Sequence, residues 1–252
     1  MVRAPTRDCG APGRHSGAVL KACLNGPLTL ADHPGVPVTP AAIAQAAAEA
    51  VAAGADALHV HPKDSLGRDS LRAEHLDPVV RAIRAAAPGV PLGVTTGAWA
   101  EPLPATRAAH VTAWTELPDF ASVNWHEEGA ELVATALLGR GIGVEAGIWY
   151  PDAAAAFVAS PLAGRCLRIL VETTTDSAEE ALVTAAAILD TVRPLGLPTL
   201  LHGEGGSAWP VYEYASALGL DRRIGLEDVQ VLPDGSPAAS NAHLVAAAVR
   251  PL

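Results

Sequence analysis

The sequence predicts a single-domain α/β protein with the closed (β/α)8 TIM-barrel fold, and three observations lead to that prediction. The chain has 252 residues, and one such barrel needs about 250. Short apolar segments alternate eight times with alanine-rich helical segments, at a spacing of roughly thirty residues. Strands that alternate with helices in this way pair in parallel. The competing open Rossmann-type sheet usually has a Gly-x-Gly-x-x-Gly turn after its first strand, and Leu24-Asn25-Gly26-Pro27 is not one.

The first strand and helix illustrate how each unit is identified. An apolar run over 19–24 ends at a polar residue and predicts a strand. Thr39 can cap the helix that follows, and Pro40 suits the first helical position. The alanine-rich body of this helix covers 41–53 and stops at Gly54.

The other seven units repeat this pattern. Apolar runs predict strands at 57–61, 91–96, 120–125, 143–148, 167–172, 198–202 and 223–227. Helical stretches follow them at 74–87, 103–114, 128–139, 151–158, 177–193, 207–217 and 238–249. Ser177 can cap the sixth of these helices, and Glu179 and Glu180 favour its first turn.

Residues 1–16 differ from the rest of the chain. They contain three arginines, two prolines and two glycines, and no apolar period. We expect a poorly ordered tail there, with the catalytic barrel over 17–252.

The composition excludes several classes of protein. The net charge of −10 opposes a general attraction to nucleic acid. Cys9, Cys23 and Cys166 are too few and too widely spaced for a disulfide framework or a zinc ribbon, and they predict a reducing, cytoplasmic compartment. No apolar run reaches the ~18 residues of a membrane helix and none resembles a signal peptide, so we expect no membrane partner.

Polar residues stand at the ends of the predicted strands, where TIM-barrel enzymes have their active sites. Seven strand ends carry an amide, an imidazole or a carboxylate, and the third carries two hydroxyl groups. A barrel with a purely structural role would not need this set. Its members are Asn25, His59, His61, Thr95, Thr96, Asn124, His126, Glu145, Glu172, His202, Glu204, Glu227 and Asp228.

His59 and His61 give the sharpest functional signal. Side chains two residues apart in a strand share a face, so both imidazoles can hold one metal ion. Two core histidines are the structural alternative. Glu227 is one candidate for the third ligand, and His202 with Glu204 is the other. Two imidazoles and a carboxylate favour zinc, with manganese, iron or cobalt as other divalent transition metals.

Arg223 lies close to two carboxylates in the sequence. It shares a strand face with Glu227, so a salt bridge between them is the structural alternative to metal binding. With Asp228 it can orient a substrate carboxylate or hold a base, or it can only close the barrel. The glycine-rich turn 203–207 can bind an anion at a helix start, or its glycines can serve the loop conformation.

These motifs resemble those of the β-keto acid cleavage enzymes, whose founding activity is the cleavage of 3-keto-5-aminohexanoate. The resemblance runs from about residue 19 to 249, although the chain is short for the family and has its own sequence at 202–206. The matching segments are Pro37-Val38-Thr39-Pro40, Ala53-Gly54-Ala55, His59-Val60-His61, Thr95-Thr96-Gly97, Val144-Glu145, Arg223-Ile224-Gly225-Leu226-Glu227-Asp228 and Asn241-Ala242-His243-Leu244-Val245.

The resemblance implies a zinc-dependent enzyme that condenses a β-keto acid with acetyl-CoA and cleaves the product to acetoacetate and a new acyl-CoA. His59, His61 and Glu227 would bind the metal. Asp228 and Arg223 would assist deprotonation of the keto acid, together with the hydroxyl group of Thr95. The family also implies a homo-oligomer, a dimer or a tetramer. The remaining residues expected to contact substrate are Glu145, Asn25, Thr96, Gly97, Ser122 and Asn124.

Three other functions remain open from the sequence. The same ligands would serve a metal-dependent aldolase or hydrolase that acts on a small oxo acid without CoA. Lys21 in the first strand would serve a Schiff-base aldolase. A metal sensor without catalysis would not need the polar residues around the metal.

Overall fold

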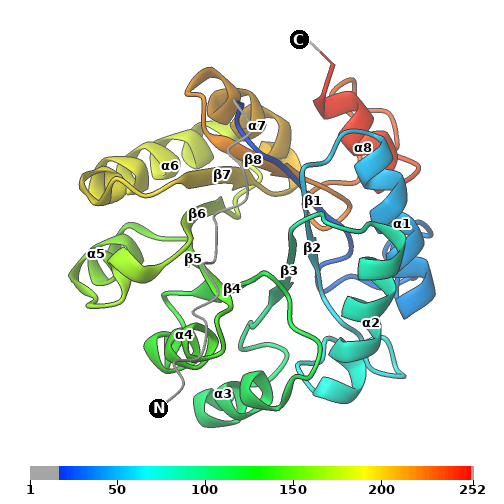
Figure 1. Cartoon of the computed structure of the whole chain (residues 1–252). Helices are drawn as coiled ribbons and strands as arrows, with labels where there is room; N and C mark the ends of the chain where they lie inside the picture. The colour runs from blue at the N-terminus through cyan, green and yellow to red at the C-terminus, as the bar shows by residue number, and fades with distance from the viewer. Residues whose placement is uncertain (1–16, 251–252) are drawn as a thin grey trace, which may run out of the picture.

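Eight parallel strands close into a barrel in the computed structural model, which describes residues 17–250 (Figure 1). Each strand pairs with the next one in the chain, and the last pairs with the first, so the predicted TIM barrel is confirmed. The predicted tail, 1–16, lies outside the described residues. The strands are Leu20–Cys23 (β1), Ala57–Val60 (β2), Leu92–Thr95 (β3), Phe120–Asn124 (β4), Gly143–Ile148 (β5), Arg168–Thr173 (β6), Thr199–Gly203 (β7) and Asp221–Ile224 (β8).

Eight α-helices form the outer ring of the described part of the chain (Figure 1). They are Pro40–Ala52 (α1), Ala73–Ala86 (α2), Pro104–Ala113 (α3), Ala130–Gly139 (α4), Pro151–Ala159 (α5), Ala178–Val192 (α6), Ala208–Ala217 (α7) and Asn241–Ala248 (α8). Thr39 and Ser177 cap α1 and α6 as predicted, because their hydroxyl oxygens accept the N–H groups of Ala42 and Glu180. Short 3-10 helices that the sequence did not predict cover Ala163–Arg165, Arg193–Leu195 and Gly205–Ser207.

Charged side chains fill part of the barrel interior. The Nζ atom of Lys21 in β1 lies 2.6 Å from a carboxylate oxygen of Glu145 in β5, and both side chains are fully buried. β1 and β5 face each other across an eight-stranded barrel, so this ion pair crosses the interior. Arg168 in β6 lies 3.1 Å from both Glu145 and Asp221. These ion pairs form a floor beneath the carboxyl ends of the strands.

Phe120 completes this floor. Its ring lies 5.6 Å from the Nζ atom of Lys21 and 5.7 Å from the guanidinium carbon of Arg168, which is within the range of cation–π attraction. The ring packs against Gly93 of the neighbouring strand, where an added Cβ would lie 1.9 Å from a ring atom. Glycine at 93 is therefore required for this packing.

The last strand is shorter than predicted. The sequence places a strand at 223–227, whereas β8 ends at Ile224. Gly225 approaches β1 so closely that a Cβ there would lie 1.9 Å from the carbonyl oxygen of Cys23. The chain then turns, and the N–H groups of Asp228 and Val229 both donate to the Gly225 carbonyl. Glu227 therefore lies in a turn and not on a strand face.

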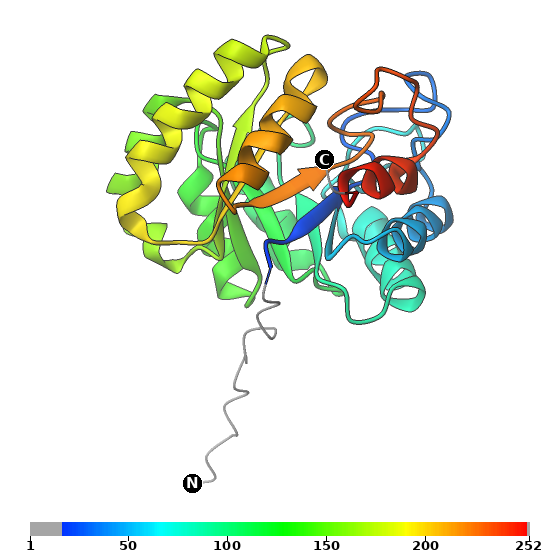
Figure 2. The ribbon, with the colours of Figure 1, turned by 90° about the horizontal axis from the view of Figure 1, so that it is seen from above.

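The loops after β1 and β8 lie side by side at one rim of the barrel (Figure 2). A ring nitrogen of His33 lies 3.0 Å from the carbonyl oxygen of Ala238, which links the two loops. The side chain of Asn241 joins the same region, since it bonds to the Leu226 N–H and the Leu24 carbonyl, at 2.8 Å each. Among the described residues, no helix has the length and apolar character needed to span a membrane.

Candidate metal centre

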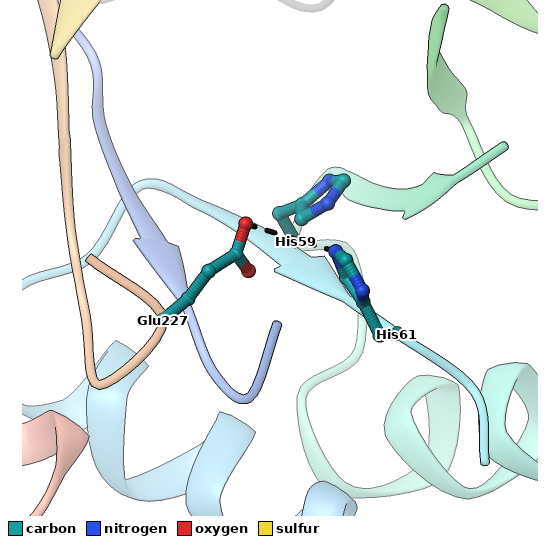
Figure 3. Close-up of side chains that lie close together, drawn as sticks. All are labelled: His59, His61 and Glu227. Atoms are coloured by element: carbon teal, nitrogen blue, oxygen red, sulfur yellow. Dashed lines mark ion pairs between the residues drawn. The ribbon is translucent and has the colours of Figure 1, made fainter. Parts of the chain in front are cut away.

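His59, His61 and Glu227 come together at the carboxyl ends of the strands. Each offers one ligand atom, and these atoms lie within 4.8 Å of one another (Figure 3). His59 lies in β2 and His61 just after it, while Glu227 follows β8. β1 lies between those two strands, so the loop after β8 can reach over it to the histidines. The structure thus brings together the three residues that the sequence assigned to a metal.

The fit of these residues to a divalent cation rests on their unpartnered atoms. Nδ1 of His59 and Oε2 of Glu227 are buried and have no hydrogen-bond partner among the described residues. Buried polar atoms are nearly always bonded, and a cation held between the three residues would satisfy both. Burial lowers the pKa of His59 well below its usual value, which keeps the imidazole neutral. Two imidazoles and a carboxylate are a donor set of the zinc type.

Glu227 is an ionised carboxylate in this arrangement. Burial alone raises its pKa, but Arg223 and His61 outweigh burial and hold the pKa well below the ordinary range. The carboxylate also packs against Gly26, which has a positive φ of 52°. A Cβ at Gly26 would lie 2.5 Å from the Glu227 side chain, so glycine there allows the approach.

His61 is held from two sides. Asn25, which we expected to contact substrate, instead uses its amide on the backbone: it donates to the carbonyls of Pro37 and His61 and accepts the His61 N–H at 2.8 Å. The imidazole Nδ1 of His61 lies 2.6 Å from a carboxylate oxygen of Asp69. Burial lowers the pKa of His61, but Glu227 and Asp69 raise it to about 9, so a metal ion would displace a proton.

Asp69 and Lys63 are residues that the sequence analysis missed. The Lys63 ammonium group lies 2.5 Å from the second carboxylate oxygen of Asp69, and the two residues form an isolated antiparallel bridge. An imidazole that binds metal usually donates its other N–H to a carboxylate. This rule predicts an acidic partner for His61. Several acidic residues follow His61 in the sequence, however, and the rule does not say which of them is the partner.

Arg223 and Asp228 form a buried ion pair beside the three candidate ligands. The guanidinium group of Arg223 makes two hydrogen bonds to one Asp228 oxygen, at 2.5 and 3.0 Å. It also reaches Glu227 at 2.8 Å. The second Asp228 oxygen, Oδ2, is buried and has no hydrogen-bond partner among the described residues. Burial raises the pKa of Asp228 to about 6 although Arg223 opposes this, which suits a general base.

The pair His202 and Glu204 lies apart from the candidate ligands. Nε2 of His202 lies 2.8 Å from a carboxylate oxygen of Glu172 in β6, and Nδ1 lies 3.7 Å from Asp228. Burial and Arg223 lower the pKa of His202 to about 3. Burial and the Glu172 carboxylate raise the pKa of Glu204 to about 8. In the described part of the chain, the one metal-type group contains Glu227 and not these residues, so geometry favours Glu227 as third ligand.

The glycine-rich turn after β7 uses its own N–H groups. Gly205 donates to the Asp228 carbonyl at 2.8 Å, Gly206 to a carboxylate oxygen of Asp176 at 2.9 Å, and Ser207 to the Glu204 carbonyl at 3.1 Å. Gly205 has a φ of +55°, which favours glycine. The geometry therefore favours a role for these glycines in the conformation of the loop over a role in anion binding.

The other expected site residues lie on β3, β4 and β5 or directly after β3. The Thr95 hydroxyl accepts the Gly97 N–H, the Thr96 hydroxyl donates to the Ser122 carbonyl, and the Asn124 amide donates to Glu127. Glu127 pairs in turn with the buried Arg107 of α3. Glu145 lies in the floor with Lys21, as described above. The structure therefore does not bring Glu145 or Asn25 to the metal ligands as open polar groups.

Comparisons with known proteins identify the family of the chain and support its fold. The sequence model of a family described as beta-keto acid cleavage enzyme matches residues 18–136 and 144–252. Among solved structures, a binary complex of ObcA with oxaloacetate is similar at 18% identity and a TM-score of 0.62, over 84% of this chain and 62% of that one. A ternary complex of ObcA with a C4-CoA adduct and oxalate matches at 17% identity and a TM-score of 0.63, with the same coverage.

A third solved structure shows how widely the fold is shared. The 3-dehydroquinate dehydratase from Geobacillus kaustophilus matches at 15% identity and a TM-score of 0.60, over 92% of this chain and 90% of that one. At such identities these likenesses establish the barrel fold alone. The chain also spans only 62% of the length of the ObcA chain.

Proposed function

The chain belongs to the beta-keto acid cleavage enzyme family, and from that premise we propose that it condenses a β-keto acid with acetyl-CoA. Cleavage of the product then gives acetoacetate and a new acyl-CoA. The proposed metal is zinc, held by His59, His61 and Glu227. The homo-oligomer and the cytoplasmic location expected from the sequence belong to the same proposal.

The observation that carries the proposal is the position of the Arg223–Asp228 pair beside the three candidate ligands. Glu227 and Asp228 are neighbours in one turn, and Arg223 bonds to both carboxylates. A general base and a cation site thus share one end of the barrel. A base and a Lewis acid acting together can abstract a proton next to a carbonyl group and stabilise the enolate that forms.

The residues of this chain have separate tasks in the proposed reaction. Arg223 holds one oxygen of Asp228, so the other oxygen can accept the proton from the α-carbon of the keto acid. The buried positions of Arg223 and Asp228 exclude water from that proton. His59, His61 and Glu227 would hold a zinc ion, which would supply a Lewis acid for the negative charge that develops on the keto acid. The Thr95 hydroxyl, at the end of β3, would assist Asp228.

The CoA part of the proposal draws on the family and on ObcA. ObcA has been captured with oxaloacetate and with a C4-CoA adduct and oxalate. We transfer from it the pairing of a small oxo acid with a CoA thioester. One alternative is favoured by the segment 202–206, where this chain has its own sequence in place of the family's: a metal-dependent aldolase or hydrolase that acts on a small oxo acid without CoA.

A turnover assay with zinc-loaded protein tests the proposal. A panel of β-keto acids is incubated with and without acetyl-CoA, and acetoacetate and acyl-CoA products are measured. We expect both products only when acetyl-CoA is present. Cleavage that does not depend on acetyl-CoA would establish the aldolase or hydrolase instead.

Asp228→Asn is the matching variant. It keeps the shape of the side chain and removes the base, so we expect normal zinc content and a turnover that is lower by roughly 10²–10⁴-fold. Near-normal turnover in this variant would remove Asp228 from the mechanism.

A further inference from the structure

Trp99 lies over one of the candidate metal ligands. It belongs to the loop between β3 and α3, and its ring stacks on the imidazole of His61 with a centroid distance of 5.9 Å and an interplanar angle of 15°. The indole Nε1–H donates a hydrogen bond of 2.8 Å to a carboxylate oxygen of Asp69. This is the oxygen that also accepts from His61.

Asp69 is the point at which three parts of the chain meet. Its carboxylate accepts from His61 after β2, from Lys63 in the same loop, and from Trp99 in the next loop. The Asp69 side chain is only 4% exposed, so its carboxylate has little contact with water. Bonds to an ionised group in such surroundings are roughly twice as strong as neutral ones. The orientation of the His61 ring depends on where this carboxylate is held.

The position of Trp99 is not a result of core packing. The residue is 48% exposed, although tryptophan is a large apolar side chain. Its ring lies against Gly97, where a Cβ would come within 2.3 Å of two ring atoms. The backbone φ of Gly97 is not positive, so no special backbone conformation calls for glycine there. Glycine is needed at this position because of the contact with the Trp99 ring. The conformation of this loop therefore brings the indole N–H to Asp69.

We propose that Trp99 is a positioning residue of the metal centre: its indole N–H fixes the Asp69 carboxylate, and Asp69 in turn fixes His61 for metal binding. This inference rests on the proposed metal site of His59, His61 and Glu227. It adds that the loop after β3 controls the affinity of a site whose ligands lie on β2 and after β8. Trp99 acts through Asp69 and contacts no metal ion itself.

Trp99→Phe separates the hydrogen bond from the stacking. The phenyl ring can still lie on His61, but it has no N–H for Asp69. We expect the dissociation constant for Zn²⁺ to rise by about tenfold, the lower end of the range for loss of an outer partner of a ligand. The measurement is a competition titration of the metal-free full-length protein with a chelator. Co²⁺ provides a second readout, because its visible absorption band follows the geometry of the ligands and should change in Trp99→Phe.

Trp209→Phe is the matched control. Trp209 lies in α7 and also donates its indole N–H, but to the Val231 carbonyl at 2.8 Å and not to Asp69. We expect this variant to bind Zn²⁺ as the wild type does. Denaturant unfolding of each metal-free variant shows whether the fold itself is affected.

A double-mutant cycle tests whether Trp99 acts through Asp69. Asp69→Asn alone should raise the dissociation constant by about 10–100-fold. If the inference is correct, Trp99→Phe adds little further loss in the Asp69→Asn background, since the two residues belong to one chain of contacts. Fully additive losses would overturn it.

The remaining outcomes distinguish this inference from the proposed function. Equal Zn²⁺ affinity and an unchanged Co²⁺ spectrum in Trp99→Phe would overturn the role of Trp99 and leave the metal site standing. A wild type that binds neither Zn²⁺ nor Co²⁺ would overturn the metal site and this inference together.

Discussion

Glu227 joins the candidate metal site to the candidate base. Its carboxylate accepts from Arg223 at 2.8 Å, and one of its oxygens lies 3.7 Å from Nε2 of His61. The residue that follows it in the same turn is Asp228. A change at Glu227 therefore tests the ligand assignment with a single side chain.

We predict that Glu227→Gln loses zinc. Loss of an outer partner of a ligand typically costs 10–100-fold in metal affinity, so loss of a ligand charge should cost more than about 100-fold. Metal content after desalting, measured by plasma mass spectrometry, checks this. Glu204→Gln is the control, because Glu204 lies outside the candidate ligand group and should leave about one zinc per chain. A Glu227→Gln protein with full zinc would show that another residue is the ligand.

At the scale of elements, the ion pair between β1 and β5 gives Glu145 a structural task. The resemblance places Glu145 against substrate, whereas its carboxylate bonds to Lys21 and lies 3.1 Å from Arg168 in the closed floor. The floor joins β1, β5, β6 and β8, so it ties together opposite sides of the barrel. The effect of Glu145 on the stability of the fold can therefore be measured separately from any effect on catalysis.

We predict that Glu145→Gln lowers the free energy of unfolding by about 3–5 kcal/mol, since it leaves the Lys21 charge buried without its carboxylate. Urea unfolding followed by circular dichroism measures the change. Asp190→Asn is the control, because that carboxylate pairs with Arg193 at an exposed surface and should matter little. A stable Glu145→Gln protein with lost turnover would return Glu145 to the substrate site.

Glu145 also shows where sequence reasoning stops. Alternation along a strand predicts that the side chain points inward, and it does. The height of an inward residue depends on the stagger between strands, and the register places Glu145 beside Arg168 and Ser122, three residues before the end of β5. His59 and His61 lie at the very end of a short strand, so their place near the mouth could be predicted without the register.

The contacts of the loop residues could not be predicted from the sequence, for a related reason. Lys63, Asp69 and Trp99 meet through contacts between two loops, and loops have no periodicity that a sequence pattern can reveal. Asn25 was predicted at a strand end and is found there, but its amide serves the backbone of His61. Sequence therefore predicts which residues reach the mouth more readily than it predicts their partners.

At the scale of the whole molecule, four acidic side chains gather at the mouth of the barrel. Glu172, Glu204, Glu227 and Asp228 all lie there, with Arg223 as the shared cation. Close carboxylates with too few cations keep protons that they would otherwise release. Stability of the fold should therefore depend on pH.

Glu204 sets the direction of that dependence. Burial and Glu172 raise its pKa from 4.5 to about 8, so the folded protein holds a proton that the unfolded chain has released. Folding stability from this group is present below about pH 4.5 and is lost as the pH rises toward 8. We predict that Glu204→Gln flattens the decline in unfolding free energy of the metal-free protein between pH 5 and 8.

Urea unfolding of wild type and Glu204→Gln at four pH values across that range measures the difference. Glu213→Gln, on the exposed face of α7, is the control and should follow the wild-type profile. Parallel profiles for wild type and Glu204→Gln would show that Glu204 ionises normally in the fold.

The two lysines of the chain have a consequence for its chemical durability. Lys21 and Lys63 are the only lysines in the sequence, and both are buried in ion pairs, with 0% and 6% exposure. Activated acyl groups damage proteins by acylating exposed lysine amines. Under the proposed reaction, a barrel that keeps both lysines inside presents no lysine target to its acyl-thioester substrate. An amine-directed acylating probe would mark Lys21 and Lys63 only in molecules that have opened.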